Sequence, residues 1–254
     1  MSLDKYFFLT SLAAILIGMS KGGLPSIGSL SVPLLSLIIS PVTAAVLLLP
    51  IYIISDVVGV YLYRKNYSLK NLQILVPAGV LGVVIGWLTA SFTSDIAIKL
   101  MIGLIGVIFC LSTWLRKTSN NIKSSNIKKG LFWGALSGFT SFISHSGAPP
   151  FQVYILPQKL SKIEFAGTAT IFFALVNLAK ITPYQMLRPY SMANFDSALV
   201  LIPFAILGTV LGAFLTKRIP DRLFFKFIQI SLFLISLKLI TDVVQYLIIN
   251  GFHW

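Results

Sequence analysis

The stretch Gly18-Met-Ser-Lys-Gly-Gly-Leu-Pro-Ser-Ile-Gly28 interrupts a sequence that is otherwise apolar enough to lie in a lipid bilayer. Non-helical backbone at membrane depth is tolerated only where protein buries it or where it lines a wet cavity. A lysine at that depth is costly and marks a functional site by default. We therefore expect the break to form part of a binding site with Lys21 as its fixed cation. The alternative is that Lys21 extends to a membrane interface.

Composition places the chain among polytopic membrane proteins. Its 254 residues are 56% hydrophobic and 11% charged, with a mean hydropathy of +0.89. Several apolar runs reach the roughly 20 residues that cross a hydrocarbon core. The net charge of +13 arises from cations in the short loops between these runs, which indicates membrane topology rather than nucleic-acid binding. The single cysteine, Cys110, provides neither a disulfide nor a metal cluster, and we expect no cofactor.

The second half of the chain repeats the first. We divide it into an N-terminal repeat (1–115), a basic cytoplasmic linker (116–129) and a C-terminal repeat (130–254). The break at Gly18–Gly28 aligns with a second one, Gly138-Phe-Thr-Ser-Phe-Ile-Ser-His-Ser-Gly-Ala-Pro-Pro150. Other pairs, at an offset of 121 or 126, are Asp56 and Asn177, Tyr63 and Tyr184, Pro77 and Pro203, Gly82 and Gly208, and Gly86 and Gly212. A duplication explains why these residues recur in the same order.

Loop charges indicate that the two repeats have opposite orientations in the membrane. The basic loop Arg64–Lys70 is expected in the cytoplasm and the turn Thr93–Asp95 outside. In the second repeat the corresponding loop Gln185–Asn194 carries one arginine, and the corresponding turn Lys217–Arg222 is basic. The predicted fold is an all-α polytopic membrane protein of two inverted repeats, each with a re-entrant (broken-helix) hairpin plus about three transmembrane helices. Tyr184, near a predicted helix end, is expected to anchor at the interface.

Four motifs resemble those of the sulfite exporter TauE/SafE family of bacterial and archaeal membrane transporters. They are Ser20-Lys21-Gly22-Gly23, Ser31-Val32-Pro33-Leu34-Leu35, Ser144-His145-Ser146-Gly147-Ala148-Pro149-Pro150, and Phe172-Phe173 with Asn177 and Lys180. The resemblance covers nearly the whole chain. It implies transport of small sulfur-containing or carboxylate anions across the inner membrane, with sulfite, thiosulfate and organosulfonates as the substrates usually discussed.

The chemistry of both breaks suits an oxyanion. Helices that start after Gly23 and after Pro150 would direct free backbone N–H groups toward the bilayer middle. Serine and threonine hydroxyls can donate to sulfite or sulfonate oxygens. The expected substrate-binding residues are Ser20, Lys21, Gly22, Gly23, Ser26, Thr140, Ser141, Ser144, His145, Ser146, Gly147, Asn177 and Lys180.

Two residues are candidates for coupling transport to a second ion. Asp56 lies deep in an apolar run and aligns with Asn177, three residues before Lys180 and on the same helical face. Two interpretations of Asp56 stay open, a coupling role and simple neutralisation of Lys21 or Lys180. His145 can carry a proton near neutral pH, or serve only as a hydrogen-bond donor.

The sequence therefore predicts a secondary transporter that moves a small sulfur-containing anion by alternating access, with proton coupling as a further hypothesis. Alternatives are a passive anion channel, or an uptake carrier for thiosulfate or small carboxylates. An enzyme is disfavoured because the sequence has no metal-ligand cluster, no nucleophile–base pair and no nucleotide-binding loop. The expected partners are a small anionic substrate and the lipid bilayer, with a homodimer left open and nucleic acid excluded.

Overall fold

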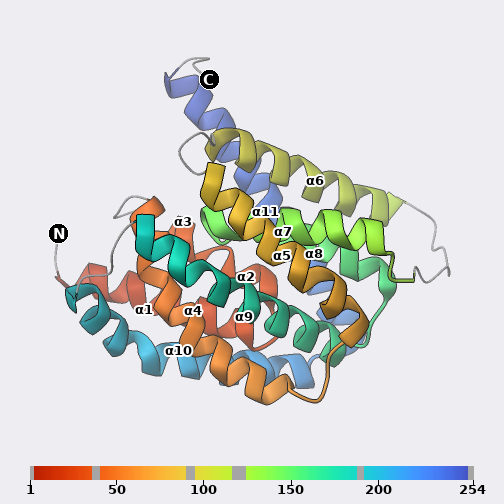
Figure 1. Cartoon of the computed structure of the whole chain (residues 1–254), viewed down its shortest axis with the longest axis horizontal. Helices are drawn as coiled ribbons and strands as arrows, with labels where there is room; N and C mark the ends of the chain where they lie inside the picture. The colour runs from red at the N-terminus through yellow and green to blue at the C-terminus, as the bar shows by residue number, and fades with distance from the viewer. Residues whose placement is uncertain (1–2, 36–40, 90–94, 116–123, 188–191, 251–254) are drawn as a thin grey trace.

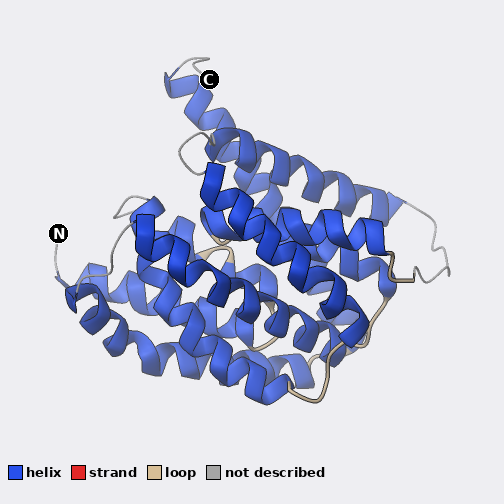
Figure 2. Cartoon of the chain, viewed as in Figure 1, coloured by secondary structure: helices blue, strands red, loops and turns tan. Residues whose placement is uncertain are grey.

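The computed structural model describes residues 3–35, 41–89, 95–115, 124–187 and 192–250. These ranges are helical apart from short turns and loops, and they contain no strand (Figure 2). The helices are α1 (Leu3–Lys21), α2 (Pro25–Gly28), α3 (Ser31–Leu35), α4 (Pro41–Tyr63), α5 (Leu69–Thr89), α6 (Asp95–Leu115), α7 (Ile127–Ser144), α8 (Ala148–Ile155), α9 (Lys162–Leu187), α10 (Met192–Arg218) and α11 (Asp221–Asn250). A 3₁₀ turn, Leu156–Gln158, follows α8. The all-α prediction is confirmed for the described residues.

Several of these helices are long and apolar enough to cross a bilayer. In the described part of the chain they are α5, α9, Leu199–Arg218 of α10 and Asp221–Ile249 of α11. Their outward faces carry exposed aliphatic side chains such as Leu88 and Leu207, which are 66% and 60% exposed. Leucine on an outer helix face is what a lipid environment favours. The chain is therefore a multi-pass membrane protein.

The first break is real but shorter than predicted. Helix α1 continues through Gly18 to Lys21, and the non-helical backbone begins at Gly22. Gly23 has a φ of +114°, a left-handed conformation that only glycine adopts without strain. The expectation that the break starts at Gly18 was wrong because Gly18 serves helix packing. A side chain there would meet the backbone carbonyl of Ala205 in α10.

The second break is also shorter than predicted. Helix α7 runs through Ser144, and His145 ends it with a left-handed backbone of φ 53°. Helix α8 then begins at Ala148, so the expectation that it starts after Pro150 was wrong. Both prolines of the motif lie in its first turn, where a helix needs no N–H donor. Both breaks are buried, from Lys21 to Ser26 and from His145 to Gln152.

Glycines let helices from opposite halves of the sequence pack closely. Helix α1 packs on α10 and α5 packs on α7, while α4 and α9 lie between these two pairs (Figure 1). A side chain at Gly138 of α7 would meet the carbonyl of Gly79 in α5, and one at Gly208 of α10 would meet the carbonyl of Ile15 in α1. Small residues at such contacts are the usual means of close packing between membrane helices.

Three further expectations have different outcomes. Tyr184 is buried, and its hydroxyl donates to the carbonyl of Phe142 at 2.5 Å, so its prediction as an interfacial anchor was wrong. Helix α7 begins at Ile127, inside the predicted linker, where the Asn126 side chain caps it by accepting a hydrogen bond from the N–H of Lys129. Most of the turn Thr93–Asp95 lies outside the described residues.

Candidate functional site

The first break delivers a buried lysine to a carboxylate. Lys21, the last residue of α1, is 3% exposed, and its Nζ lies 2.8 Å from Oδ1 of Asp56 in α4, which is 5% exposed. The ammonium also lies over the rings of Tyr52 and Phe173, at 5.1 Å and 5.6 Å from their centroids. Within the described part of the chain, the Asp56 carboxylate is its ion-pair partner. The contact is an ion pair by distance, and Oδ1 of Asp56 accepts no hydrogen bond of good geometry from a described group.

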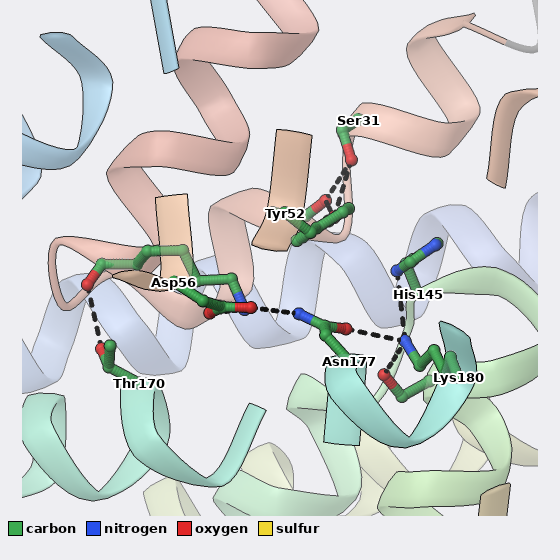
Figure 3. A network of polar contacts seen from close by, with 10 residues as sticks. Ser31, Tyr52, Asp56, His145, Thr170, Asn177 and Lys180 are labelled. Carbon is green, nitrogen blue, oxygen red and sulfur yellow. Dashed lines mark hydrogen bonds and ion pairs between the residues drawn. The ribbon is translucent and has the colours of Figure 1, made fainter. Parts of the chain in front are cut away.

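Asn177 connects this ion pair to a second buried lysine. Its Nδ2 donates to Oδ2 of Asp56 at 2.7 Å, and its Oδ1 accepts from Nζ of Lys180 at 3.0 Å (Figure 3). Asn177 and Lys180 lie one turn apart on α9, which places both side chains on one face of the helix. The amide dipole is therefore oriented by opposite charges at its two ends.

The second break surrounds Lys180 with neutral acceptors. Its Nζ donates to Oγ of Ser141 in α7 at 2.8 Å, and lies 3.3 Å from Nδ1 of His145. Together with Asn177, these groups provide three acceptors for the three N–H donors of an ammonium. Lys180 is fully buried, and a buried charge is tolerated only when it is paired or fully hydrogen-bonded.

Hydrogen bonding also fixes the tautomer of His145. Its Nε2 lies 3.1 Å from the carbonyl of Ala45 in α4, and because a carbonyl only accepts, Nε2 must carry the hydrogen. Nδ1 then accepts from Lys180. A proton on Nδ1 as well would place an N–H donor of the ring opposite the N–H donors of the Lys180 ammonium. The ring stacks on Tyr52, with centroids 4.4 Å apart and planes 2° from parallel. In this arrangement the His145 ring is neutral and contacts Lys180 through Nδ1.

The polar cluster contains two lysines and one carboxylate, joined by the neutral side chains of Asn177 and His145. With both lysines as ammonium groups and Asp56 as a carboxylate, it has one more positive than negative charge. All of these side chains are buried. An uncompensated charge acts more strongly in a protein interior than in water, so a cluster with this balance would favour a nearby anion.

The predicted hydroxyl donors divide into two groups. Ser141 contacts Lys180, and Ser26 accepts a hydrogen bond from Nε2 of Gln152 at 2.6 Å, which links the segment after the first break to α8. The other hydroxyls, in Thr140, Ser144 and Ser146, bond to nearby backbone carbonyls of their own segment. Ser20 is buried against Gly28.

Helix α2 has only four residues, so its dipole is smaller than the sequence led us to expect.

The remaining predicted residues supply backbone to the same two turns. The carbonyl of Gly22 accepts hydrogen bonds from the hydroxyls of Tyr63, at 2.6 Å, and Thr216, at 3.1 Å. Gly23 provides the left-handed turn, and the carbonyl of Gly147 accepts from Ser137 at 2.7 Å. These bonds hold both turns in place.

Sequence reasoning missed four buried side chains at the two breaks. Tyr52 donates to the carbonyl of Gly28 and lies 2.9 Å from the hydroxyl of Ser31, while Thr170 donates to the carbonyl of Lys21. The four side chains are therefore Tyr52, Ser31, Thr170 and Gln152, the last of which donates to Ser26. A signal for Tyr52 was available, because it lies four residues before Asp56 and so on the same helical face.

A family model described as Sulfite exporter TauE/SafE matches residues 10–239. The chain belongs to the sulfite exporter TauE/SafE family. The match spans every residue of the polar cluster and both breaks. No curated protein and no solved structure matches the chain. TauE/SafE is a family of membrane transporters and not of enzymes, which supports the general expectation of a transporter.

Proposed function

We propose that this TauE/SafE protein is a secondary transporter that carries a small sulfur-containing anion across the bacterial inner membrane. Sulfite or an organosulfonate such as sulfoacetate is the substrate, and alternating access is the mechanism. The observation that carries the proposal is the buried Lys21 side chain, which is ion-paired with Asp56 and belongs to a buried cluster of two lysines and one carboxylate. Such a group would bind an oxyanion through charge-assisted hydrogen bonds.

The anion would bind beside Lys21, between the two breaks. Ser26 and Gln152 already join the segments that follow these breaks. Lys180 contributes charge, since its donors are occupied by Ser141, Asn177 and His145. Non-helical backbone at membrane depth is a feature of transporter binding sites at the junction of two repeats.

Alternating access would arise from two inverted repeats that rock against each other. The helix contacts support this relation, because α1 packs on α10 and the corresponding helices α7 and α5 pack on each other. The aligned residues Asp56 and Asn177 bond to one another. The aligned tyrosines Tyr63 and Tyr184 each donate to a backbone carbonyl next to the break of their own repeat. A pseudo-two-fold axis between α4 and α9 would produce all three observations.

Transport in proteoliposomes tests the proposal. Labelled sulfite or sulfonate uptake should saturate and should show counterflow against unlabelled anion, whereas a passive channel would show no counterflow. Lys21→Ala should reduce anion binding roughly 10- to 100-fold, the loss expected for charge-assisted hydrogen bonds. Lys65→Ala, which removes an exposed lysine from a loop, is the matched control. Normal binding by a folded Lys21→Ala protein would refute the site.

Two measurements address the substrate and the coupling ion. A thermal-shift screen against sulfite, thiosulfate, sulfoacetate and simple carboxylates separates the proposed substrates from those of an uptake carrier for thiosulfate or carboxylates. Asp56 and His145 are the proposed coupling residues. An unchanged dependence of transport on external pH in His145→Gln would leave His145 as a positioning residue alone.

A further inference from the structure

We infer that the binding site is matched to an anion with a single net negative charge. This inference rests on the proposed function and narrows it to singly charged anions such as hydrogen sulfite or a simple sulfonate; sulfoacetate, with two negative charges, would bind only together with a proton. The charge balance of the polar cluster carries it: two buried lysines face one buried carboxylate, and no other charged side chain contacts them in the described residues. One negative charge would make the occupied site neutral, and a second would leave an uncompensated charge in the membrane interior.

The inference takes both lysines as ammonium groups. Lys180 has a hydrogen-bond partner for each of the three N–H donors of an ammonium, and Lys21 lies 2.8 Å from a carboxylate oxygen. His145 is neutral because one ring nitrogen faces a carbonyl and the other faces Lys180. Tyr52 is hydrogen-bonded to Ser31 and Gly28 through its hydroxyl and adds no charge.

Asp56 sets the charge balance of the cluster because its carboxylate already neutralises the Lys21 ammonium. The carboxylate is the internal counter-ion of the pair, and its other oxygen is held by Asn177. With Asp56 ionised, the cluster has room for one further negative charge. A substrate with two charges would bind only together with a proton, either on the substrate or on Asp56. The same residue thus links the charge of the substrate to proton co-transport.

Two anions of nearly equal size and shape test the inference. Methanesulfonate carries one negative charge and sulfate carries two. Their dissociation constants are measured by titration calorimetry on the purified full-length protein in detergent. The wild type should bind methanesulfonate more tightly than sulfate by about tenfold or more, because one excess charge in a poorly screened site has at least that effect.

Three variants separate charge from shape. Asp56→Asn adds one positive charge to the cluster and should shift the preference toward sulfate by about tenfold or more. Lys180→Met makes the cluster neutral and should weaken methanesulfonate binding by a similar factor. The double variant Asp56→Asn/Lys180→Met restores the wild-type charge and should regain the preference for methanesulfonate. Lys65→Ala, in an exposed loop, is the control.

The outcomes distinguish this inference from the proposed function. An unchanged preference in Asp56→Asn, or a double variant that binds methanesulfonate more weakly than either single variant, would overturn charge matching. So would a wild type that prefers sulfate or binds both alike while Lys21→Ala loses both. A wild type that binds no oxyanion at all would instead overturn the proposed function. If Asp56→Asn does not fold, the wild-type preference and Lys180→Met still decide the matter.

Discussion

Removing Lys21 should destabilise the protein because it leaves Asp56 buried without its counter-ion. The two side chains are 3% and 5% exposed, and Nζ lies 2.8 Å from Oδ1. Breaking a buried pair on one side typically costs about 3–5 kcal/mol. Asn177 still donates to the other carboxylate oxygen in Lys21→Met, so we expect the lower end, about 3 kcal/mol.

Removing both partners should restore most of that loss. Replacement of a whole buried ion pair by apolar residues of similar size is often neutral or stabilising. Asp56→Leu does, however, deprive Asn177 of its acceptor, and an unsatisfied buried donor costs about 1–3 kcal/mol. Lys21→Met/Asp56→Leu should therefore be less destabilised than Lys21→Met alone, and the coupling energy between the two positions should exceed about 2 kcal/mol.

A double-mutant cycle in detergent micelles measures this coupling. Unfolding by sodium dodecyl sulfate, followed by tryptophan fluorescence, gives the free energy of unfolding of each variant. The control cycle uses Lys162 and Asp221, an ion pair of 3.2 Å at the starts of α9 and α11, in which the Asp221 side chain is 67% exposed. An exposed pair contributes about 0.2–1 kcal/mol.

One result would refute the reasoning. If the coupling energy of the buried pair is no larger than that of Lys162 and Asp221, the two charges do not depend on each other for burial. Lys21 would then be solvated, and its assignment as a buried cation would be wrong.

Three further predictions concern packing and hydrogen bonds. Gly138→Ala should destabilise the protein by about 1–3 kcal/mol, because the added methyl meets a backbone carbonyl of α5. Gly86→Ala meets only the side chain of Phe142 and should cost less in the same unfolding assay. Equal losses would contradict this. Tyr184→Phe removes a buried hydrogen bond to α7 and should cost about 1–3 kcal/mol; no loss of stability would show that the carbonyl has another donor. Cys110 is fully buried, so a water-soluble maleimide should label it only after unfolding, and rapid labelling of the native protein would place it at a surface.

Several features of the fold were predictable because they depend on local physical rules. Apolar runs of membrane length predicted the helices, and the glycines and proline of Gly18–Gly28 predicted an interruption between α1 and α2. These signals are local because backbone conformation at glycine and proline is set by the residue itself. The exact limits of each break were not predictable. Gly18 and Gly138 are helical because they face neighbouring helices, and a sequence does not distinguish a glycine of that kind from one in a turn.

The candidate site was likewise predictable only in part. The sequence indicated that Lys21, Asp56, Asn177 and Lys180 lie at membrane depth, where charged and polar groups need partners. It left open whether Asp56 pairs with Lys21 or with Lys180. The structure pairs it directly with Lys21 and reaches Lys180 through Asn177.

The sequence by itself determined that this chain is a helical membrane protein with two interrupted helices and buried cations, because hydropathy and the conformational limits of glycine and proline are properties of single residues and short segments. Tertiary structure alone decided which partners the buried groups have. Only the packing of α1, α4, α7 and α9 brings Lys21, Asp56, Lys180 and His145 together. The inferred charge balance of the cluster and the tautomer of His145 rest on those distances, because both depend on contacts between residues far apart in the chain.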